Sequence, residues 1–435
     1  MKDKIQAILT VAVAATALAA AAAARAEAPL VRHLKIEGVV SPIMAEFLVE
    51  GIEEAEEDGA SLVVVSLDTP GGLDPSMRKI IKKILASKVP VAVYVSPPGG
   101  RAASAGTFIT LAAHVAAMAP NTSIGAAHPV TLGAGGEGAD EAMVEKITND
   151  AASYIKSLAR RRGRNEKWAE LAVRKSASLS AEDAVTENVV DFVAENLDEL
   201  LKKADGRKVK VAGRTIPVRT KGARVEELTP DFRQRFLAVV TNPNVAYLLL
   251  IIGFYGLIFE LSNPGSILPG VAGGICIILA FYALSTLPVN YAGVALIVFA
   301  IILFLAEIKI TSHGLLAVGG TISMLLGSIL LISTPATYLR ISWAVIIPAV
   351  VTTVLFFLFA VGMGLRAQRR KPTTGDKGMV GERGRAVTAV GPAGGQVFVR
   401  GEYWKASAAE DIPAGALVEV TRADGLIVEV RRAEE

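Results

Sequence analysis

The chain has 435 residues, which is enough for two or three folding units. Hydrophobic residues make up 52% of it and charged residues only 20%, so the composition excludes an ordinary water-soluble protein. The formal net charge of +3 is small and gives no reason to expect a nucleic-acid partner. With Cys276 as its single cysteine, the chain cannot form an intramolecular disulfide or a cysteine-based metal site.

The first segment has the pattern of an export signal. Lys2 and Lys4 provide positive charge ahead of an alanine-rich apolar stretch over residues 5–24. Ala24 and Ala26 place small residues at the two positions that a signal peptidase reads. We therefore expect a signal peptide over residues 1–26, with an uncleaved N-terminal anchor as the alternative.

Residues 27–222 alternate β-rich runs with helical stretches, and a glycine-rich loop is expected over 133–140. Two of the β-rich runs are continuous and β-branched, as in strands that are buried on both faces of a sheet. The order strand, helix, strand predicts right-handed crossovers and an α/β domain. The expected strands are 31–36, 61–67, 89–95 and 189–193, and the expected helices are 42–56, 77–86 and 142–162.

A linker over 223–244 is expected to lead into a transmembrane region over 245–365. That region contains five apolar segments of about the length, roughly 20 residues, that crosses a bilayer as a helix. The alternative is four spans, with the first segment re-entrant or interfacial. The expected spans are 245–262, 267–287, 291–308, 314–333 and 342–364.

The orientation follows from export and from charge. An exported N-terminal domain followed by an odd number of spans places the C-terminus in the cytoplasm. Arg366, Arg369, Arg370 and Lys371 follow the last span, as expected for its cytoplasmic side. We expect a multi-pass protein of the plasma (inner) membrane, with the α/β domain extracytoplasmic and the C-terminal domain cytoplasmic.

The C-terminal segment, residues 376–435, is polar again and contains five short β-rich runs with glycine-rich turns. Five strands in about 60 residues suit a small closed barrel of the OB-fold kind. The segment has no basic stripe with interleaved aromatic residues, so we expect an interaction module rather than a nucleic-acid binder. The expected strands are 386–390, 396–399, 402–406, 417–421 and 426–430.

Two glycine-rich turns are the candidate catalytic elements. Residues 68–72 read Asp-Thr-Pro-Gly-Gly after one strand, and residues 102–106 read Ala-Ala-Ser-Ala-Gly after the next. A serine nucleophile needs a sharp turn into a helix N-terminus, and Ser104 with its small neighbours fits that need. Gly72 and Ala105 would offer backbone N–H groups to an oxyanion. The alternative for Ser104 is that it only caps a helix.

The combination of both turns resembles the ClpP/crotonase superfamily, and the motifs around them resemble NfeD-type membrane-bound serine proteases. The resemblance extends over nearly the whole chain after residue 26, including the membrane block and the terminal barrel. The further motifs are Ser-Pro-Pro-Gly at 96–99, Met-Ala-Pro-Asn-Thr-Ser-Ile-Gly at 118–125, Lys-Ile-Thr-Asn-Asp at 146–150, Gly-Arg-Asn at 163–165, Gly-Glu-Tyr-Trp at 401–404 and Asp-Gly-Leu at 424–426.

The resemblance implies a serine endopeptidase in which Ser104 is the nucleophile and Lys146 the general base. A lysine can act as a base when desolvation favours its neutral form. Lys156, ten residues later on the same predicted helix, is the alternative base. Gly71 and Gly72 are expected to bind substrate. No histidine is assigned a catalytic role, and no metal or cofactor is expected.

The expected reaction is cleavage of apolar segments of membrane-associated proteins, with a stomatin-like (prohibitin-fold) protein as the substrate or partner that the resemblance implies. The alternative is a scaffold of membrane microdomains, also a partner of stomatin-like proteins, with little proteolytic activity. Self-association as a dimer or higher oligomer is expected through the α/β domain. Arg101, just before the serine turn, either binds substrate or faces solvent.

Overall fold

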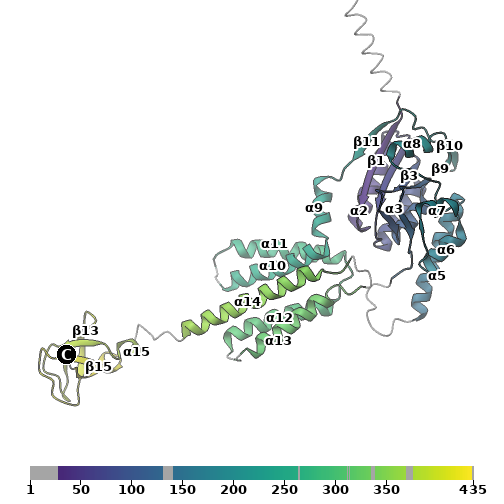
Figure 1. The fold of residues 1–435 in the computed structure, drawn as a ribbon. Coiled ribbons are helices and arrows are strands. Elements are labelled where there is room, and N and C mark those ends of the chain that lie inside the picture. The colour runs from purple at the N-terminus through teal and green to yellow at the C-terminus, as the bar shows by residue number, and fades with distance from the viewer. Residues whose placement is uncertain are drawn as a thin grey trace, which may run out of the picture. The chain divides into compact units, whose positions relative to one another are not determined.

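The computed structural model describes residues 28–130, 141–262, 265–310, 312, 314–334, 339–368 and 376–433 (Figure 1). The signal peptide predicted over 1–26 and the loop predicted over 133–140 lie outside these residues.

Six parallel strands form the main sheet of the α/β domain, in the order β11-β1-β2-β3-β5-β8. Neighbouring side chains of the central strands enter different cores: Val63 and Val65 pack on one face, and Val64 on the other. Burial on both faces explains why these strands are continuous apolar runs in the sequence. The strands are β1 (Leu30–Glu37), β2 (Leu62–Asp68), β3 (Val91–Val95), β5 (Val115–Met118), β8 (Phe192–Val193) and β11 (Arg224–Leu228).

Helices and a hairpin cover the two faces of this sheet (Figure 1). One core contains residues of the helices from α2 to α7, and the other contains residues of α8 and of the hairpin β9–β10. The helices are α2 (Pro42–Glu57), α3 (Asp74–Ala86), α4 (Ala105–Ala112), α5 (Glu141–Arg162), α6 (Glu166–Arg174), α7 (Ala181–Thr186) and α8 (Leu197–Ala204), and the hairpin is β9 (Lys208–Val211) with β10 (Arg214–Pro217).

A small second sheet supports the loops at one end of the domain. It consists of β4 (Arg101–Ala103), β6 (Ser123–Gly125) and β7 (Ser178–Ser180), in that order. β4 is parallel to β6, and an isolated bridge from Thr69 to Ala102 joins β4 to the end of β2. The two glycine-rich turns identified in the sequence are therefore held side by side by backbone pairing.

The segment 223–244, predicted to be a linker, contains regular structure. β11 extends the main sheet beside β1, and the pairs run from Leu30–Arg224 to Leu34–Leu228. Helix α9 (Phe232–Val240) follows and ends two residues before α10. The strand was missed because its sequence, Arg-Val-Glu-Glu-Leu, is mostly charged, as suits an edge strand.

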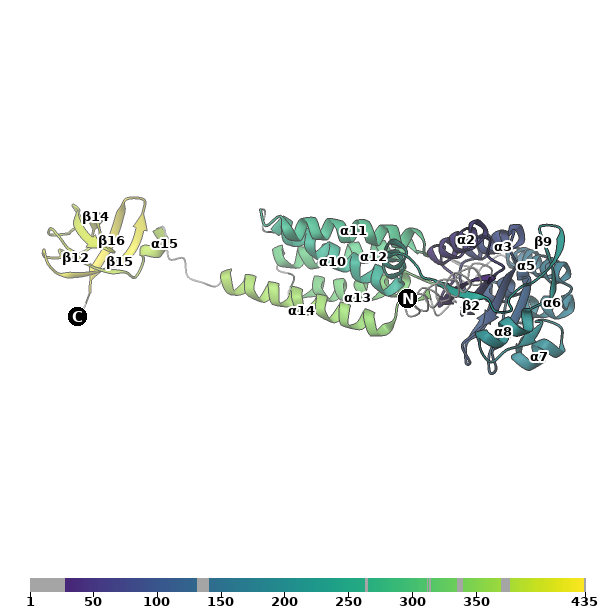
Figure 2. The same ribbon diagram turned by 90° about the horizontal axis from the view of Figure 1, so that it is seen from above.

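Five apolar helices follow the α/β domain, and α10 and α11 lie side by side (Figure 2). By length and hydropathy, α10 and α11 could each cross a membrane, whereas the apolar stretches Tyr291–Glu307, Leu315–Leu330 and Trp343–Phe359 are shorter. The number of membrane crossings therefore stays a prediction. The helices are α10 (Pro243–Ser262), α11 (Leu268–Ser285), α12 (Tyr291–Lys309), α13 (Leu315–Leu330) and α14 (Trp343–Gln368).

The C-terminal domain is a closed five-stranded barrel in the order β12-β13-β14-β16-β15. Alternate residues such as Val397, Val418 and Val428 fill its core. Together with the α/β domain and the helical block, the barrel confirms the predicted fold class. Its elements are α15 (Asp376–Met379), β12 (Arg383–Ala386), β13 (Gly395–Val399), β14 (Glu402–Ser407), β15 (Leu417–Asp424) and β16 (Ile427–Arg432).

Candidate active site

Ser104 occupies a strained turn between β4 and α4. Its φ of 51° and ψ of −115° lie in a region that residues with a side chain rarely adopt. The backbone holds this geometry: the Ser104 N–H donates to the Gly125 carbonyl (3.0 Å), and the Ser104 carbonyl accepts from the Thr107 N–H (3.0 Å). The hydroxyl does not cap α4 and has no hydrogen-bond partner among the described residues. Strand, sharp turn and helix together form the arrangement that exposes a nucleophile.

The glycine turn at the end of β2 is fixed beside this serine. The Ala103 N–H donates to the Thr69 carbonyl (3.0 Å), and Gly72 forms a bridge with Val40. A Cβ at Gly72 would lie 2.4 Å from the Val40 carbonyl oxygen, and one at Gly106 would lie 2.6 Å from Cγ2 of Thr69. Both glycines are thus required for the close approach of the two turns.

The N–H groups of Gly72 and Ala105 are candidate oxyanion donors. Hydrogen bonds on either side of Gly72, from Val40 to Gly71 and from Leu73 to Val40, leave its own N–H directed away from Val40. Ala105 is the first residue of α4, where a helical N–H has no acceptor within the helix. Neither group has an acceptor among the described residues. Both residues line the same cavity as Ser104.

Two arginines hold the other end of α4. Arg164 is buried, and its Nη1 donates to the carbonyls of Thr110, Leu111 and Ala113 while its Nη2 contacts Asp191 (3.0 Å). Arg162 adds a bond from its Nε to the Ala112 carbonyl (2.8 Å). These bonds satisfy the last carbonyls of the helix, which have no partner within it. The eight-residue helix is therefore anchored at the end opposite the serine.

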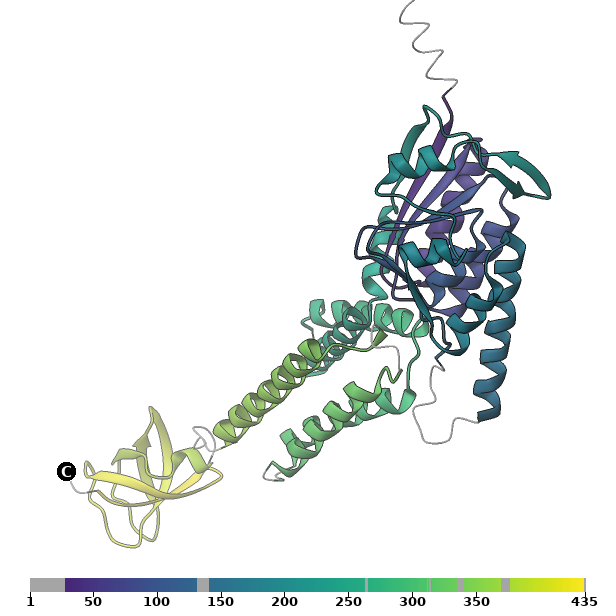
Figure 3. The ribbon, with the colours of Figure 1, turned by 45° about the vertical axis from the view of Figure 1, so that its right-hand side comes forward.

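The cavity beside Ser104 has a volume of about 530 Å³ and also contains Lys146. Lys146 comes from the first half of α5, which extends beyond the body of the domain (Figure 3). Its side chain is exposed, as are Met143 and Ile147 near it. The structure therefore brings the predicted nucleophile and the predicted base to one cavity, with the base on its open side.

The structure separates Lys156 from this cavity. Its Nζ lies 2.7 Å from the Glu170 carboxylate, which also pairs with Arg174. This ion pair directs the Lys156 amine toward α6. Lys156 also lines a different surface depression, away from Ser104.

Three histidines form hydrogen bonds that indicate a structural rather than a catalytic role. Nδ1 of His114 accepts from the Val91 N–H, and burial together with the positive charges of Arg162 and Arg164 lowers the pKa of His114 to about 3. His128 contacts the Val173 carbonyl, and His33 contacts Oγ of Ser66. None of the three lines the cavity, whereas His313 is outside the described residues.

Gly71 and Arg101, the other candidates for substrate binding, differ from Gly72 in their surroundings. Gly71 is buried, its N–H donates to Oγ1 of Thr69, and its carbonyl accepts from the Val40 N–H. Gly71 therefore supports the turn and offers no unbonded N–H to a substrate. Arg101 is exposed and is absent from the residues that line the cavity, and its backbone N–H donates to Asp68.

Sequence reasoning missed the charged wall of the cavity. Arg78 on α3 contacts both Asp74 and Asp150, and its guanidinium lies 4.6 Å from the centroid of the Tyr154 ring. These contacts join α3 to α5. The spacing of four residues between Asp74 and Arg78 is visible in the sequence, but the contact with α5 is not. The remaining walls are apolar and include Met77, Phe108, Pro129, Val130 and Ala151.

Three family models match the chain in order. The NfeD1b N-terminal domain matches residues 30–212, the NfeD integral membrane domain matches 244–361, and the NfeD-like C-terminal, partner-binding domain matches 376–432. The chain is thus an integral membrane protein, and its barrel belongs to a type that binds a protein partner.

Similar proteins agree with this order of domains. The membrane-bound protease PH1510 of Pyrococcus horikoshii is 39% identical over 412 residues, which covers 92% of this chain and 93% of the relative. The membrane protein NfeD1b of Bacillus subtilis is 29% identical over 357 residues, covering 78% of this chain and 75% of the relative. One similar solved structure is a lysine-to-alanine mutant of the 1510-N membrane-bound stomatin-specific protease in complex with a substrate peptide. It is 38% identical in sequence, with a TM-score of 0.45, and the match covers 49% of this chain and 97% of that one.

An α/β domain with a serine at a strand–helix turn, joined to an integral membrane domain, defines a membrane-bound serine protease. Its sequence identity to a membrane-bound protease over nearly the full length of both chains is well above the level of chance likeness. The chain belongs to the NfeD family of membrane-bound proteases.

Proposed function

We propose that the protein is an endopeptidase with a Ser104–Lys146 dyad, cleaving apolar segments of a stomatin-like membrane protein. One observation supports it most: Ser104, Gly72, Ala105 and Lys146 line one cavity, whose other walls are apolar apart from Asp74, Arg78 and Asp150. The stomatin-like substrate follows from membership of the family.

In the proposed reaction, neutral Lys146 Nζ removes the proton from Ser104 Oγ as the oxygen attacks the peptide carbonyl. The N–H groups of Gly72 and Ala105 donate to the oxyanion that forms. The protonated lysine then gives its proton to the leaving amine, and an acyl-enzyme remains on Ser104. Water, deprotonated by the same lysine, releases the second product.

Because Lys146 is exposed to solvent, we propose that the bound substrate itself shields the lysine from water. A charged amine loses its proton more readily when water is removed from around it. An apolar peptide segment seated against Phe108, Val130 and Ile147 would cover the lysine. The need to exclude water from Lys146 favours apolar substrates over polar ones, since an apolar segment fills the cavity and displaces its water.

The test compares two lysines on one helix in the full-length protein in lipid nanodiscs. Peptides from the apolar C-terminal segments of stomatin-like proteins are incubated with wild type, Ser104→Ala, Lys146→Met and Lys156→Met, and cleavage is followed by mass spectrometry. We expect Ser104→Ala and Lys146→Met to lose cleavage by at least about 10²-fold, the usual contribution of a general base. Lys156→Met serves as the control and should cleave normally.

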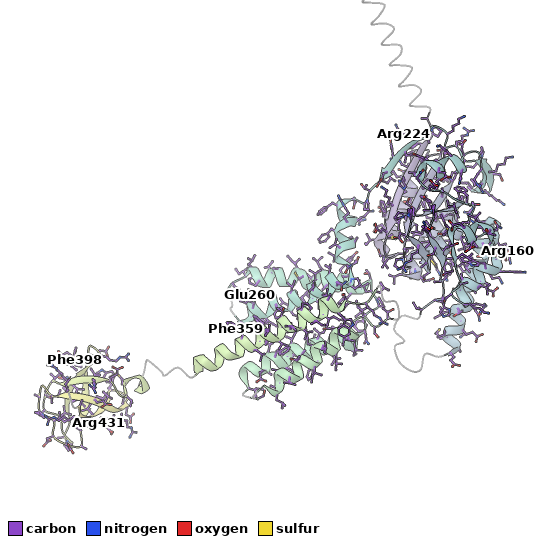
Figure 4. All side chains as sticks on the ribbon, viewed as in Figure 1. Arg160, Arg224, Glu260, Phe359, Phe398 and Arg431 are labelled. Atoms are coloured by element: carbon purple, nitrogen blue, oxygen red, sulfur yellow. The ribbon has the colours of Figure 1, made fainter. Side chains whose placement is uncertain are left out.

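Loss of cleavage in Lys156→Met but not in Lys146→Met would move the base to Lys156. Absence of cleavage by every form, with an intact fold, would favour the scaffold alternative. In that case the first surface to test for partner binding would be the barrel, where Phe398 (Figure 4) and Tyr403 are exposed on neighbouring strands.

The orientation and assembly of the protein are part of the same proposal. We place the domain boundaries at residues 26, 222, 245, 365 and 376, with the α/β domain outside the plasma (inner) membrane and the barrel in the cytoplasm. We also propose that the α/β domain self-associates. Reporter fusions after the last span and after residue 222 should report opposite sides of the membrane.

A further inference from the structure

Helix α9 has an apolar face that no described residue covers. A capping box starts the helix: the Gln234 N–H donates to Oδ1 of Asp231 (2.6 Å), and Oε1 of Gln234 accepts from the Asp231 N–H (3.0 Å). These two hydrogen bonds fix the first turn of α9, so the start of the helix and the residues on each of its faces are well defined.

The inner face of α9 is attached to the α/β domain. The Gln234 side chain is only 5% exposed and donates to Glu50 of α2 (2.7 Å). Arg233 pairs with Glu46 of the same helix (2.6 Å). The face opposite these contacts therefore points away from α2.

The outer face carries Phe232, Phe236 and Val239, at the spacing of one helical stripe, and they are 79%, 44% and 60% exposed. The two phenyl rings stack with their centroids 6.4 Å apart, which makes a continuous apolar surface. Arg235 is exposed at the edge of this stripe, where it also lines a groove between α9 and α2. Apolar residues in a stripe with a basic residue among them are typical of helices that lie in the plane of a membrane interface.

The chain itself brings this stripe to the membrane. Only Thr241 and Asn242 separate Val240 from Pro243, the first residue of α10, and three residue steps span at most about 11 Å. The integral membrane domain is matched from residue 244 onward. Figure 1 shows α9 running crosswise to α10 and α11, both of which it contacts. The stripe is thus continuous with the membrane-embedded surface.

We propose that α9 lies in the phospholipid interface, with Phe232, Phe236 and Val239 at the boundary between headgroups and acyl chains and Arg235 among the lipid phosphates. A second copy of the chain or a soluble partner could cover the same stripe, but neither would explain its position at the start of the first span. The helix anchors the α/β domain to the bilayer surface in addition to the spans. This inference does not depend on the proposed dyad.

The test uses nitroxide labels on the full-length protein in nanodiscs of phosphatidylcholine and phosphatidylglycerol. In a Cys276→Ala background, a cysteine replaces Val239 or Phe232, and Leu171→Cys on α6, where the leucine is 43% exposed, is the control. Power saturation then compares collisions with oxygen, which concentrates in lipid, and with a polar nickel complex, which stays in water.

We expect the ratio of oxygen to nickel collisions to be severalfold higher at positions 239 and 232 than at 171. Equal ratios at all three positions would show that the stripe faces water and would overturn the proposal. Protection from both reagents at 239 and 232 would show that protein covers the stripe, which also overturns it. Phe232 is almost fully exposed, so its label gives an answer even if Val239→Cys disturbs the helix.

Discussion

The two sides of the cavity differ in how firmly they are built. On the serine side, Ser104, Gly72 and Ala105 lie on turns that backbone hydrogen bonds and strand bridges hold in place. On the lysine side, Lys146 is exposed on the extended first half of α5, and the contacts from Arg78 to Asp150 and from Phe108 to Tyr154 attach that helix to its neighbours. The proposed nucleophile and oxyanion donors are thus held in place by the backbone, whereas the position of the proposed base depends on what covers α5.

Removal of the buried arginine should damage the serine side most. Arg164→Met leaves the buried carbonyls of Leu111 and Ala113 without a donor and removes one partner of Asp191, so we expect a loss of about 3–5 kcal/mol in the free energy of unfolding. Urea-pulse proteolysis of the full-length protein in detergent measures it. Arg160→Met, on the solvent-facing surface (Figure 4), is the control and should change little. Equal effects of the two substitutions would contradict the anchoring role of Arg164.

A methyl group at the oxyanion turn should reduce the rate. The Cβ of Gly72→Ala would overlap backbone atoms of Val40 and displace the N–H group that we propose as an oxyanion donor, so kcat should fall about 10²–10³-fold. Peptide cleavage by the purified protein measures it. Gly274→Ala on α11 is the control, because its Cβ meets no atom within 4 Å and its φ is not in the left-handed region. A normal rate in Gly72→Ala would remove this residue from the oxyanion site.

The buried histidine should make the serine side acid-sensitive. The pKa of His114 is about 3 in the folded protein and 6.5 ordinarily, so the unfolded chain binds the proton more readily. Its contribution to stability is therefore complete above pH 6.5 and is lost as the pH falls toward 3. His114→Gln removes this dependence, which is on the order of 5 kcal/mol between pH 6.5 and pH 3. Unfolding curves at pH 4 and pH 7 should diverge less in the variant than in wild type.

The smallest effect is expected on the lysine side. Asp150→Asn removes an exposed ion pair with Arg78, so the loss of stability should be below about 1 kcal/mol. The contact nevertheless joins α3 to α5, and hydrogen exchange in the first half of α5 should become faster without change in β2 and β3. Glu166→Gln on α6 is the control, because it removes an exposed ion pair with Arg160 near the other end of α5. Unchanged exchange in Asp150→Asn would mean that packing alone holds the helix.

Local sequence signals predicted the elements well and their long-range pairing poorly. The strand predicted at 61–67 is β2 at Leu62–Asp68, and the helix predicted at 42–56 is α2 at Pro42–Glu57, because runs of β-branched residues and the Ser41 cap with Pro42 are local signals. Helix α3 starts at Asp74 rather than at the predicted residue 77, because Pro75 suits a first helical turn.

Contacts between distant segments could not be predicted in the same way. β11 pairs with β1 across 194 residues, and no local signal marks a charged edge strand as its partner. In the barrel, the first strand is Arg383–Ala386 rather than 386–390, because Val390 instead bridges Ile412. For the site, the motif identified Ser104 and its glycines, but the ion pair of Lys156 with Glu170 depends on how α6 packs on α5.

The packing of α2 between α9 and α3 has a consequence for substrate choice. With α9 in the membrane interface, as proposed above, α2 connects the bilayer surface to α3, whose Asp74 and Met77 line the cavity. The packing of α9 on α2 and of α2 on α3 would then set the distance of the cavity from the lipid. We therefore expect the protease to select substrates by distance from the membrane: a peptide bond held too near the bilayer or too far from it should escape cleavage, whatever its side chains.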